Sequence, residues 1–201
     1  MPQYFGFLYE NTNTPRRWRR RRWRARRNIN FLTWCRVLLG QARAQLGRAS
    51  EGVALIRQGI AGALEIGFRL GLTYFIGALA EAQTRAGAVG DALATVEQAL
   101  QANPDELWWR PENLRLHGAL RLTQGDTELA EADFREAIAL ARHMGAKAPE
   151  LRATMSLARL LDQQGHRDEA RSMLADIYNW FTEGFDTVDL KEAKALLEEL
   201  S

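Results

Sequence analysis

The chain has 201 residues, of which 46% are hydrophobic and 26% charged, close to globular averages, so wholesale disorder is excluded. Its single cysteine, Cys35, excludes an internal disulfide and a cysteine-based zinc site. The longest apolar stretch, 71–80, is shorter than the ~20 residues that cross a bilayer. No secretory signal is recognisable, and together with the lone cysteine this favours a cytoplasmic protein without a transmembrane segment.

The first 28 residues differ in charge from the rest of the chain. They hold nine arginines and one acidic residue, Glu10, a net charge of +8, whereas the other 173 residues have a net charge of −6. The basic run is Arg16, Arg17, Trp18, Arg19, Arg20, Arg21, Arg22, Trp23 and Arg24, followed by Arg26 and Arg27. We therefore expect two parts, an arginine-rich and disordered arm over 1–29 and a helical repeat domain over 30–201.

The role of this arm stays open between several interpretations. Its arginines could neutralise the phosphates of a nucleic acid while its tryptophans stack on the bases. The same charge could adsorb to anionic lipid. Alternatively, the arm is a plain disordered tail, because a block of like charges repels itself, or it is a misassigned or out-of-frame start of a truncated reading frame. The repeat pattern begins abruptly near residue 30, which favours these last two interpretations.

Beyond the arm, apolar periodicity predicts helices joined in pairs. The predicted pairs are 31–46 with 50–66, 69–86 with 89–102, 109–124 with 127–143, and 149–164 with 167–181. Asn103-Pro104-Asp105 predicts a break, and Pro111 suits the first turn of the next helix. A final helix follows over 188–200, with Asp186 or Thr187 expected to accept hydrogen bonds from its free N–H groups. A terminal cap needs a polar outer side, and the outward residues here are Lys191, Glu192, Lys194, Glu198 and Glu199.

Four glycines, Gly47, Gly87, Gly125 and Gly165, end helix-like stretches at spacings of 40, 38 and 40 residues. Other positions recur in the same register, as in solenoids with periods of about 20–50 residues. Small residues stand seven before and five after each glycine, and large ones eight before and nine after. The small set is Gly40, Ala80, Gly118, Ala158, Gly52, Ala92, Ala130 and Ala170, and the large set is Leu39, Leu79, His117, Leu157, Ile56, Val96, Phe134 and Leu174. Small residues let two antiparallel helices approach closely, and the large residue nine after fills the space between them.

This order of residues resembles the tetratricopeptide (TPR) repeat over roughly 30–180. The resemblance implies an all-α, TPR-like solenoid of about four helical hairpins plus a C-terminal capping helix, and a role in holding other proteins. The sequence departs from the family pattern in two ways: its repeats exceed the standard ~34 residues, and the usual aromatic residue of the first helix is missing. Arg43, Gln83, Arg121 and Leu161 stand there instead. We interpret the chain as a divergent subtype with longer second helices.

Two segments resemble a narrower family. One runs from Trp108-Trp109-Arg110-Pro111-Glu112 to Gly118, and the other covers 177–193, from Ile177-Tyr178-Asn179-Trp180 to Lys191-Glu192-Ala193. Both are similar to the C-terminal region of bacterial adenylate/guanylate cyclase–AAA/P-loop ATPase regulators. The resemblance implies the detached or truncated regulatory tail of such a signalling protein. No catalytic role is carried over, because the sequence has no G-x-x-x-x-G-K-[ST] phosphate loop.

No residue pattern predicts catalysis, a metal site or a cofactor. His117, His143 and His166 fall in different repeats, and no two histidines stand four residues apart. His117 occupies a position that is leucine in the other repeats, so we expect a packed, hydrogen-bonded core histidine. Cys35 has no basic partner beyond Arg36 and is expected to serve packing rather than to act as a nucleophile. We therefore predict that the protein is not an enzyme.

In the TPR architecture the first helix of each pair lines the concave surface, which predicts a partner-binding groove. Positions thirteen, ten and six before each glycine should point into it. The predicted groove residues are Trp34, Gln41, Tyr74, Glu81, Glu112, Arg115, Arg152, Met155 and Arg159, with Val37, Gly77 and Ala119 among them. Aromatic residues at one end and arginines at the other suit a protein or peptide ligand with an acidic portion. Alternatively, these residues only solvate the inner face or pack against neighbours.

The remaining aromatic residues, Trp108, Trp109, Tyr178, Trp180 and Phe181, are expected to lie in the core between repeats. Two hypotheses of function follow from these patterns. The first is a non-catalytic protein–protein interaction scaffold of TPR type. The second is a nucleic-acid-binding regulator whose affinity comes from the arginine- and tryptophan-rich arm.

Overall fold

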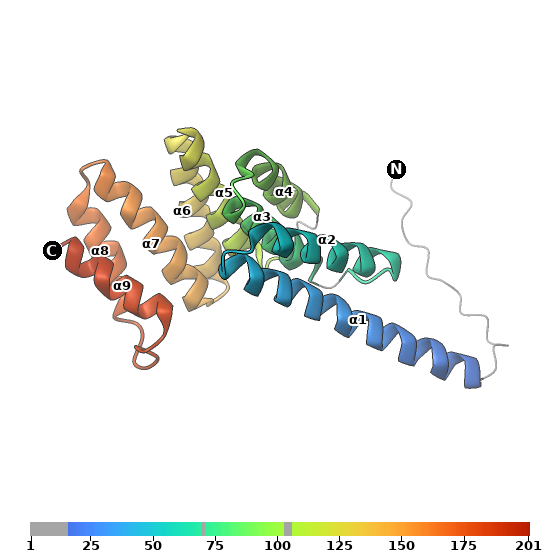
Figure 1. The fold of residues 1–201 in the computed structure, drawn as a ribbon. Coiled ribbons are helices and arrows are strands. Elements are labelled where there is room, and N and C mark those ends of the chain that lie inside the picture. The colour runs from blue at the N-terminus through green and yellow to red at the C-terminus, as the bar shows by residue number, and fades with distance from the viewer. Residues whose placement is uncertain (1–15, 70, 103–105) are drawn as a thin grey trace, which may run out of the picture.

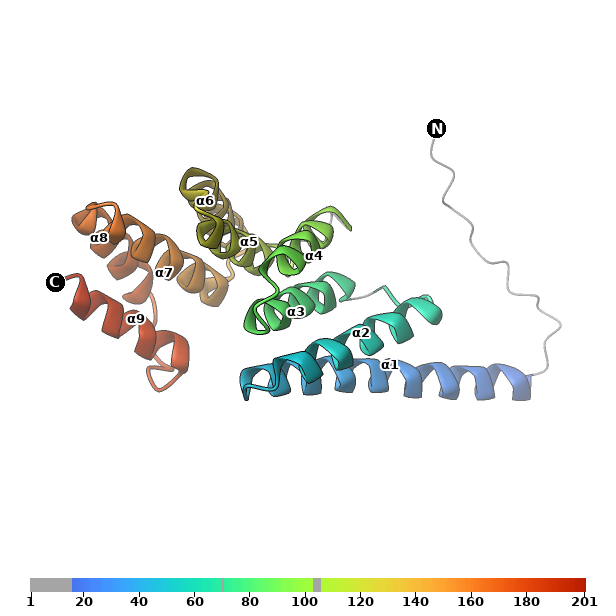
Figure 2. The ribbon, with the colours of Figure 1, turned by 45° about the horizontal axis from the view of Figure 1, so that its top comes forward.

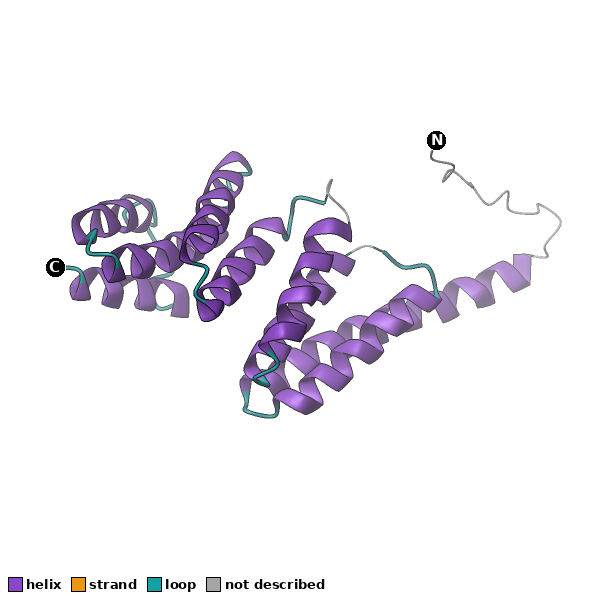
Figure 3. Ribbon diagram, turned by 90° about the horizontal axis from the view of Figure 1, so that it is seen from above, coloured by secondary structure: helices purple, strands orange, loops and turns teal. Residues whose placement is uncertain are grey.

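The computed structural model describes residues 16–69, 71–102 and 106–201 and, apart from residues 16–30 and 102, their side chains. Every regular element among these residues is an α-helix (Figure 3). In chain order they are α1 (Arg16–Gln45), α2 (Ala49–Glu65), α3 (Leu72–Arg85), α4 (Val89–Ala102), α5 (Arg110–Gln124), α6 (Thr127–His143), α7 (Lys147–Gln163), α8 (Arg167–Tyr178) and α9 (Val188–Glu199). Over the described residues this confirms the predicted all-α array of four helical hairpins and one terminal helix (Figure 1). The predicted break at 103–105 lies outside the described residues.

The helices stack into a curved solenoid. Each helix packs against the next along the chain, and the first helices of the hairpins also pack on one another, α1 on α3, α3 on α5, α5 on α7, and α7 on the terminal α9. Within the described residues the second helices α2, α4, α6 and α8 do not contact one another. Because the first helices lie closer together, the solenoid curves with α1, α3, α5, α7 and α9 on its inner side (Figure 2). We call these helices the inner layer.

The four predicted glycines close the first helix of each hairpin. Gly47, Gly87, Gly125 and Gly165 have φ angles of 82°, 78°, 88° and 84°, which place them in the left-handed region that a side chain disfavours. The N–H of the residue after each glycine returns to a carbonyl oxygen of the last helical turn, as His166 does to Leu161 at 2.8 Å. The repeat register read from these glycines is therefore confirmed as a register of turns.

The small residues of the register permit the predicted close approach of paired helices. A Cβ atom added to Gly40 would lie 2.6 Å from Ile56 Cγ1, and one added to Gly118 would lie 2.7 Å from Phe134 Cε1. Ile56 and Phe134 are the large residues nine after the glycines, and both are buried. In the first and third hairpins, the first helix thus contacts the second through a position where only a small residue fits.

Helix α1 begins at Arg16, fifteen residues before the predicted start at 31, so residues 16–29 are helical where we expected disorder. The prediction weighed self-repulsion of the arginines too heavily. Arginine is a strong helix former, and a helix already held by packing gains further residues without a new nucleation step. Residues 1–15 and the side chains of the basic run lie outside the described part of the chain, and the division at residue 29 stays a prediction.

Helix α9 covers the C-terminal end of the solenoid as predicted. Leu190, Ala193 and Leu196 are buried against α7 and α8, and the predicted outward residues of this helix are exposed. The predicted cap is wrong in one respect. Thr187 is the N-cap residue, but its hydroxyl donates to the Gly184 carbonyl at 2.7 Å and accepts no bond from the helix. Among the described residues, no helix is long and apolar enough to span a membrane.

Three side chains that we expected to be buried are exposed. Trp108 is 72% exposed and Trp180 is 57% exposed, because both stand in the connections that flank helices and not on a helix face that meets a neighbour. Cys35, expected in the packing, is also exposed. Tyr178 and Phe181 pack against the C-terminal core cluster, as predicted.

Candidate functional site

The inner layer brings the aromatic half of the predicted groove together. The Trp34 ring from α1 stacks on Tyr74 from α3 with ring centroids 5.6 Å apart, and Trp109, next to α5, lies 4.5 Å from Tyr74. The Tyr74 hydroxyl donates to Gln41 Oε1 on α1. Burial raises the pKa of Tyr74, so the hydroxyl stays a proton donor at neutral pH. These half-buried rings form a continuous apolar shelf across the first three repeats, which we call the aromatic shelf.

The predicted charged half of the groove is an ion network across three inner helices. Arg115 and Glu112, one turn apart on α5, approach to 2.6 Å. Arg152 on α7 lies 3.1 Å from the same Glu112 carboxylate and 2.8 Å from Asp189 on α9. The network therefore ties α5, α7 and α9 together through charge-assisted hydrogen bonds.

The titration behaviour of this network follows from its geometry. Burial alone would raise the pKa of the Glu112 carboxyl, but Arg115 and Arg152 outweigh that effect and hold the pKa below its ordinary value. Burial likewise opposes the charge of Arg152, yet Glu112 and Asp189 hold its pKa above the usual value. Glu112 and Arg152 are therefore both charged at neutral pH.

The remaining predicted groove residues are dispersed. Glu81 pairs with Arg85 of its own helix at 3.1 Å, and Arg159 is exposed with its guanidinium 4.0 Å from Glu192 on α9. Met155 is 3% exposed and packs in the C-terminal core cluster, so its placement on the groove surface is wrong. Val37 and Gly77, which also stand ten before their glycines, are buried as well, whereas Arg115 at the same position of the third hairpin is partly exposed.

Comparison with solved structures places this geometry in a known architecture. The chain is similar to a putative kinesin light chain with nearly identical TPR-like repeats from Podosopora anserina, with a TM-score of 0.66 and 18% identity over 86% of this chain and 85% of that one. It is similar to BtubC (BKLC) from P. vanneervenii, with a TM-score of 0.71 and 18% identity over 90% and 76% of the two chains. The fold is a TPR-like solenoid.

A third similar structure is the Rap conjugation gene regulator of the plasmid pLS20, solved in complex with the Phr* peptide. Its TM-score is 0.69 at 12% identity, and the similarity covers 98% of this chain but 53% of that one. No protein-family model matches the sequence, and no curated protein matches it. At sequence identities of 12–18%, these similarities show the fold of the chain and not its function.

Sequence reasoning missed residues that stand outside the repeat register. Asp189 and Glu192 come from α9, which is not part of a hairpin, and both approach predicted groove arginines. Trp109 belongs to the aromatic shelf, although we expected it in the core. Asp189 could have been found from its place in the first turn of the capping helix, because a terminal helix packs on the preceding first helix, here α7.

The buried polar residues His117 and Asp133 lie beside each other inside the third hairpin. His117 is buried as predicted, and its Nδ1 lies 3.0 Å from Asp133 Oδ2, but neither ring nitrogen forms a well-directed hydrogen bond. Arg121 binds the same carboxylate at 2.8 Å. Within the described residues, no group of three or more His, Cys, Asp or Glu side chains could hold a metal ion.

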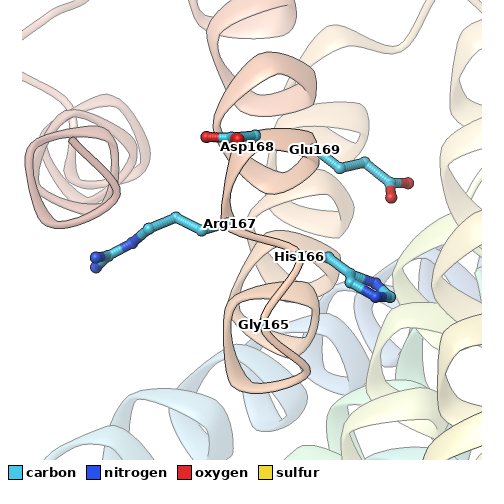
Figure 4. A pocket seen from close by; sticks show the side chains of 5 residues that line it. All are labelled: Gly165, His166, Arg167, Asp168 and Glu169. Atoms are coloured by element: carbon cyan, nitrogen blue, oxygen red, sulfur yellow. The ribbon is translucent and has the colours of Figure 1, made fainter.

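A surface hollow of about 310 Å³ lies at the start of α8, away from the groove, lined by Gly165, His166, Arg167, Asp168 and Glu169. Its side chains diverge (Figure 4). Arg167 donates to the Glu199 carbonyl at 2.6 Å, and Glu169 accepts from Arg135 at 3.2 Å. Because the polar groups point to different neighbours, the hollow has no converging set of groups that could bind a substrate.

Proposed function

We propose that the chain is a non-catalytic protein–protein interaction module whose inner layer binds a peptide or helix of another protein. The observation that carries the proposal is the aromatic shelf beside a charged network. Trp34, Tyr74 and Trp109 present half-buried rings, and aromatic residues with one accessible edge are the usual anchors of protein interfaces. The peptide held by the similar Rap regulator supports a peptide-sized ligand.

An acidic portion of the ligand fits the other half of the inner layer. Arg159 is half exposed, and its guanidinium lies 4.0 Å from the Glu192 carboxylate, too far for a hydrogen bond. It can therefore bind a ligand carboxylate without losing a close internal partner. Arg152 is already paired on both sides with Glu112 and Asp189. A ligand carboxylate would therefore bind first at Arg159, and the network would serve mainly to hold the helices in place.

A phage-displayed library of 16-residue random peptides, panned against the full chain, tests the proposal. We expect selected peptides with aromatic or aliphatic anchors and acidic residues. Arg159→Glu should weaken them by about tenfold, the effect of one charged contact. Arg171→Glu, an exposed arginine on α8, is the matched control and should leave binding unchanged. Peptides that bind both variants as well as the natural chain would contradict the use of the inner layer.

A finer proposal is that this module is the regulatory tail of a cyclase/ATPase-type signalling protein in the bacterial cytoplasm. Its support is the resemblance of the segments around Trp108 and 177–193. The DNA immediately upstream of the coding region tests it. A reading frame with cyclase and P-loop ATPase motifs is expected there, and its absence would contradict the proposal.

The alternative function is nucleic-acid binding through the basic half of α1. The observation in its favour is that Arg16–Gln45 is one helix with eleven arginines and no acidic residue. Neutralisation of several phosphates would make the logarithm of affinity fall by ~0.9 per phosphate for each tenfold rise in salt. Deletion of residues 1–28 should then abolish duplex DNA binding. Weak, salt-insensitive binding that survives the deletion would contradict this alternative.

A further inference from the structure

Helix α1 carries a second apolar face that no described helix covers. Phe31 and Leu46 are 70% and 80% exposed, and Leu32, Leu38 and Leu39 are each about half exposed. With Cys35 and Ala42, which are also exposed, they follow one side of the helix at three- and four-residue spacing, and Leu46 continues this side just after the last helical residue, Gln45. We call this set the α1 outer face.

The α1 outer face lies opposite the face by which α1 packs into the solenoid. Thr33, Val37, Gly40 and Ala44 are buried, and α1 contacts only α2 and α3 among the described elements. Figure 2 shows α2 and α3 on one side of α1 and no described helix on the other. A helix that is apolar on both sides is the pattern of a helix packed on both sides.

The repeat register identifies what normally covers such a face. Twelve, eight and five residues before the glycines, α1 has Cys35, Leu39 and Ala42, all exposed. The same positions in the later first helices are all buried: Phe75, Leu79 and Ala82 in α3, Asn113, His117 and Leu120 in α5, and Ala153, Leu157 and Leu160 in α7. Each of those helices packs against both helices of the hairpin before it. The α1 outer face is therefore shaped to receive a helix in the manner of a repeat.

The charge of α1 indicates what kind of helix could bind to the α1 outer face. Helix α1 holds eleven arginines and no acidic residue. If Leu32, Leu39 and Leu46 are taken as a positions of a heptad and Cys35 and Ala42 as d positions, Arg36 and Arg43 fall at the e positions along one edge. Arg43 shares Glu51 with Arg48, whereas Arg36 is exposed and has no ion pair within the described part of the chain. The uncompensated edge is thus positive.

A second copy of the chain fits this face poorly. Antiparallel pairing of two α1 helices places e positions opposite one another, so Arg36 would face Arg43 of the other copy. Parallel pairing would align the two segments 16–27, each with nine arginines. We propose that the α1 outer face binds an amphipathic helix of a partner protein, apolar on its docking side and acidic along its edges. The α1 outer face shares no residue with the aromatic shelf or the charged network, so a failure of this proposal leaves the proposed peptide-binding function untouched, and the reverse.

Cys35 makes the proposal directly measurable. It is the single cysteine of the chain and lies in the middle of the α1 outer face, so the rate at which Ellman's reagent modifies it reports whether the face is covered. The probe is a synthetic 21-residue peptide of three heptads with leucine at a and d and glutamate at e and g. The charge-reversed peptide with lysine at e and g is its control.

With the full chain, we expect the acidic peptide to slow modification of Cys35 by roughly tenfold at saturation, and the basic peptide to leave the rate unchanged. Leu39→Gln should weaken the acidic peptide by ~tenfold or more, since a buried leucine side chain contributes at least that to affinity. Leu129→Gln is the matched control, because Leu129 is 50% exposed on α6 and Leu39 is 48% exposed. Arg36→Glu should shift preference toward the basic peptide.

The contrary outcomes are equally distinct. Absence of protection by the acidic peptide, or equal protection by both peptides, would overturn the proposal. So would a free chain that sediments as a dimer which Leu39→Gln dissociates, because the occupant would then be a second copy. Circular dichroism of each variant, whose changed side chain is exposed, checks that the fold is retained.

Discussion

The two terminal helices of the described solenoid, α1 and α9, differ in the side that faces away from the stack. At the C-terminal end, α9 places Leu190, Ala193 and Leu196 on the core and turns charged residues outward. At the other end, α1 packs its inner side on α2 and α3 and leaves the α1 outer face exposed. Figure 1 shows α1 and α9 at the two ends of the stack.

The difference separates a stabilising end from a binding end. A solenoid repeat contacts only its neighbours, so a terminal helix must either be polar outside or be covered by something else. Contiguous apolar surface of several large side chains on a folded chain marks an interaction site. The closed end should therefore respond to mutation through stability, and the open end through binding.

The largest expected effect is removal of each end in turn. Deletion of residues 188–201 uncovers the contacts of Leu190, Leu196 and Leu200, each at most 5% exposed. Burial of three leucines corresponds to about 5 kcal/mol or more, enough to unfold or aggregate the C-terminal repeats. Deletion of residues 1–29 keeps the α1 outer face and the packing of α1 on α2 and α3, so it should change the free energy of unfolding by less than ~1 kcal/mol. Urea denaturation measures both, and similar losses at the two ends would break the comparison.

Substitution of a single leucine at each end should show the same difference in stability, with smaller changes in the free energy of unfolding. Leu196→Ala should lower the free energy of unfolding by ~2–5 kcal/mol, because the side chain is 5% exposed in the C-terminal cluster. Leu39→Ala, at a half-exposed site, should change it by less than ~0.5 kcal/mol. Thermal or urea unfolding of the two variants compares them directly. A loss above 2 kcal/mol for Leu39→Ala would mean that the α1 outer face is covered in the free chain.

The inner side of α1 can be tested through its closest approach to α2. Gly40→Ala puts a Cβ atom 2.6 Å from Ile56 and should destabilise the chain by ~1–3 kcal/mol through overpacking. Gly90→Ala in α4 meets nothing within 4 Å and should be neutral or stabilising by up to ~1 kcal/mol. Equal stabilities of the two variants would show that α1 packs on α2 by a different face.

The smallest effect concerns pH. The Glu112 carboxyl has a folded-state pKa below the ordinary 4.5, because its pairing with Arg115 and Arg152 outweighs burial. A depressed pKa contributes stability that is present above the unfolded-state pKa and is lost as pH falls through the folded-state pKa. Urea midpoints between pH 5 and 3 should therefore fall less for Glu112→Gln than for the natural chain.

Glu51, near the open end, is the control for this measurement. Its pKa is lowered mainly by the hydrogen bond from Arg48, but the pair is exposed to solvent. Glu51→Gln should alter the acid dependence less than Glu112→Gln, because water screens an exposed pair. The reverse order would contradict the role of the Glu112 network in joining α5, α7 and α9.

Local patterns were enough to predict most of the fold. Apolar periodicity placed the helices of the hairpins within a few residues, and Gly47, Gly87, Gly125 and Gly165 marked the turns between them. These features depend on residues close together in the chain. The early start of α1 at Arg16 was missed because the arm was judged by charge alone and not by helix propensity.

The groove was predicted less well than the fold. The repeat register predicts which way a side chain points from its helix, but it does not predict which other residues that side chain contacts. Tyr74 contacts both Trp34 and Gln41, and the use of these residues as a binding groove stays a prediction. Met155 is buried because it packs in the C-terminal core cluster, and Cys35 is exposed because none of the described helices packs on its side of α1. A pattern averaged over four repeats describes a helix with a repeat before it, which α1 lacks among the described residues.

The most direct test compares one register position at the open end and inside the stack. Ala42 and Ala82 both stand five residues before a glycine, yet Ala42 is exposed and Ala82 is 1% exposed. In a Cys35→Ser background, Ala42→Cys should react with Ellman's reagent at nearly the rate of a free thiol. Ala82→Cys should react at least ~100-fold more slowly, since its modification requires an opening of ~3 kcal/mol or more. Equal rates would contradict an α1 face that is open in the free chain.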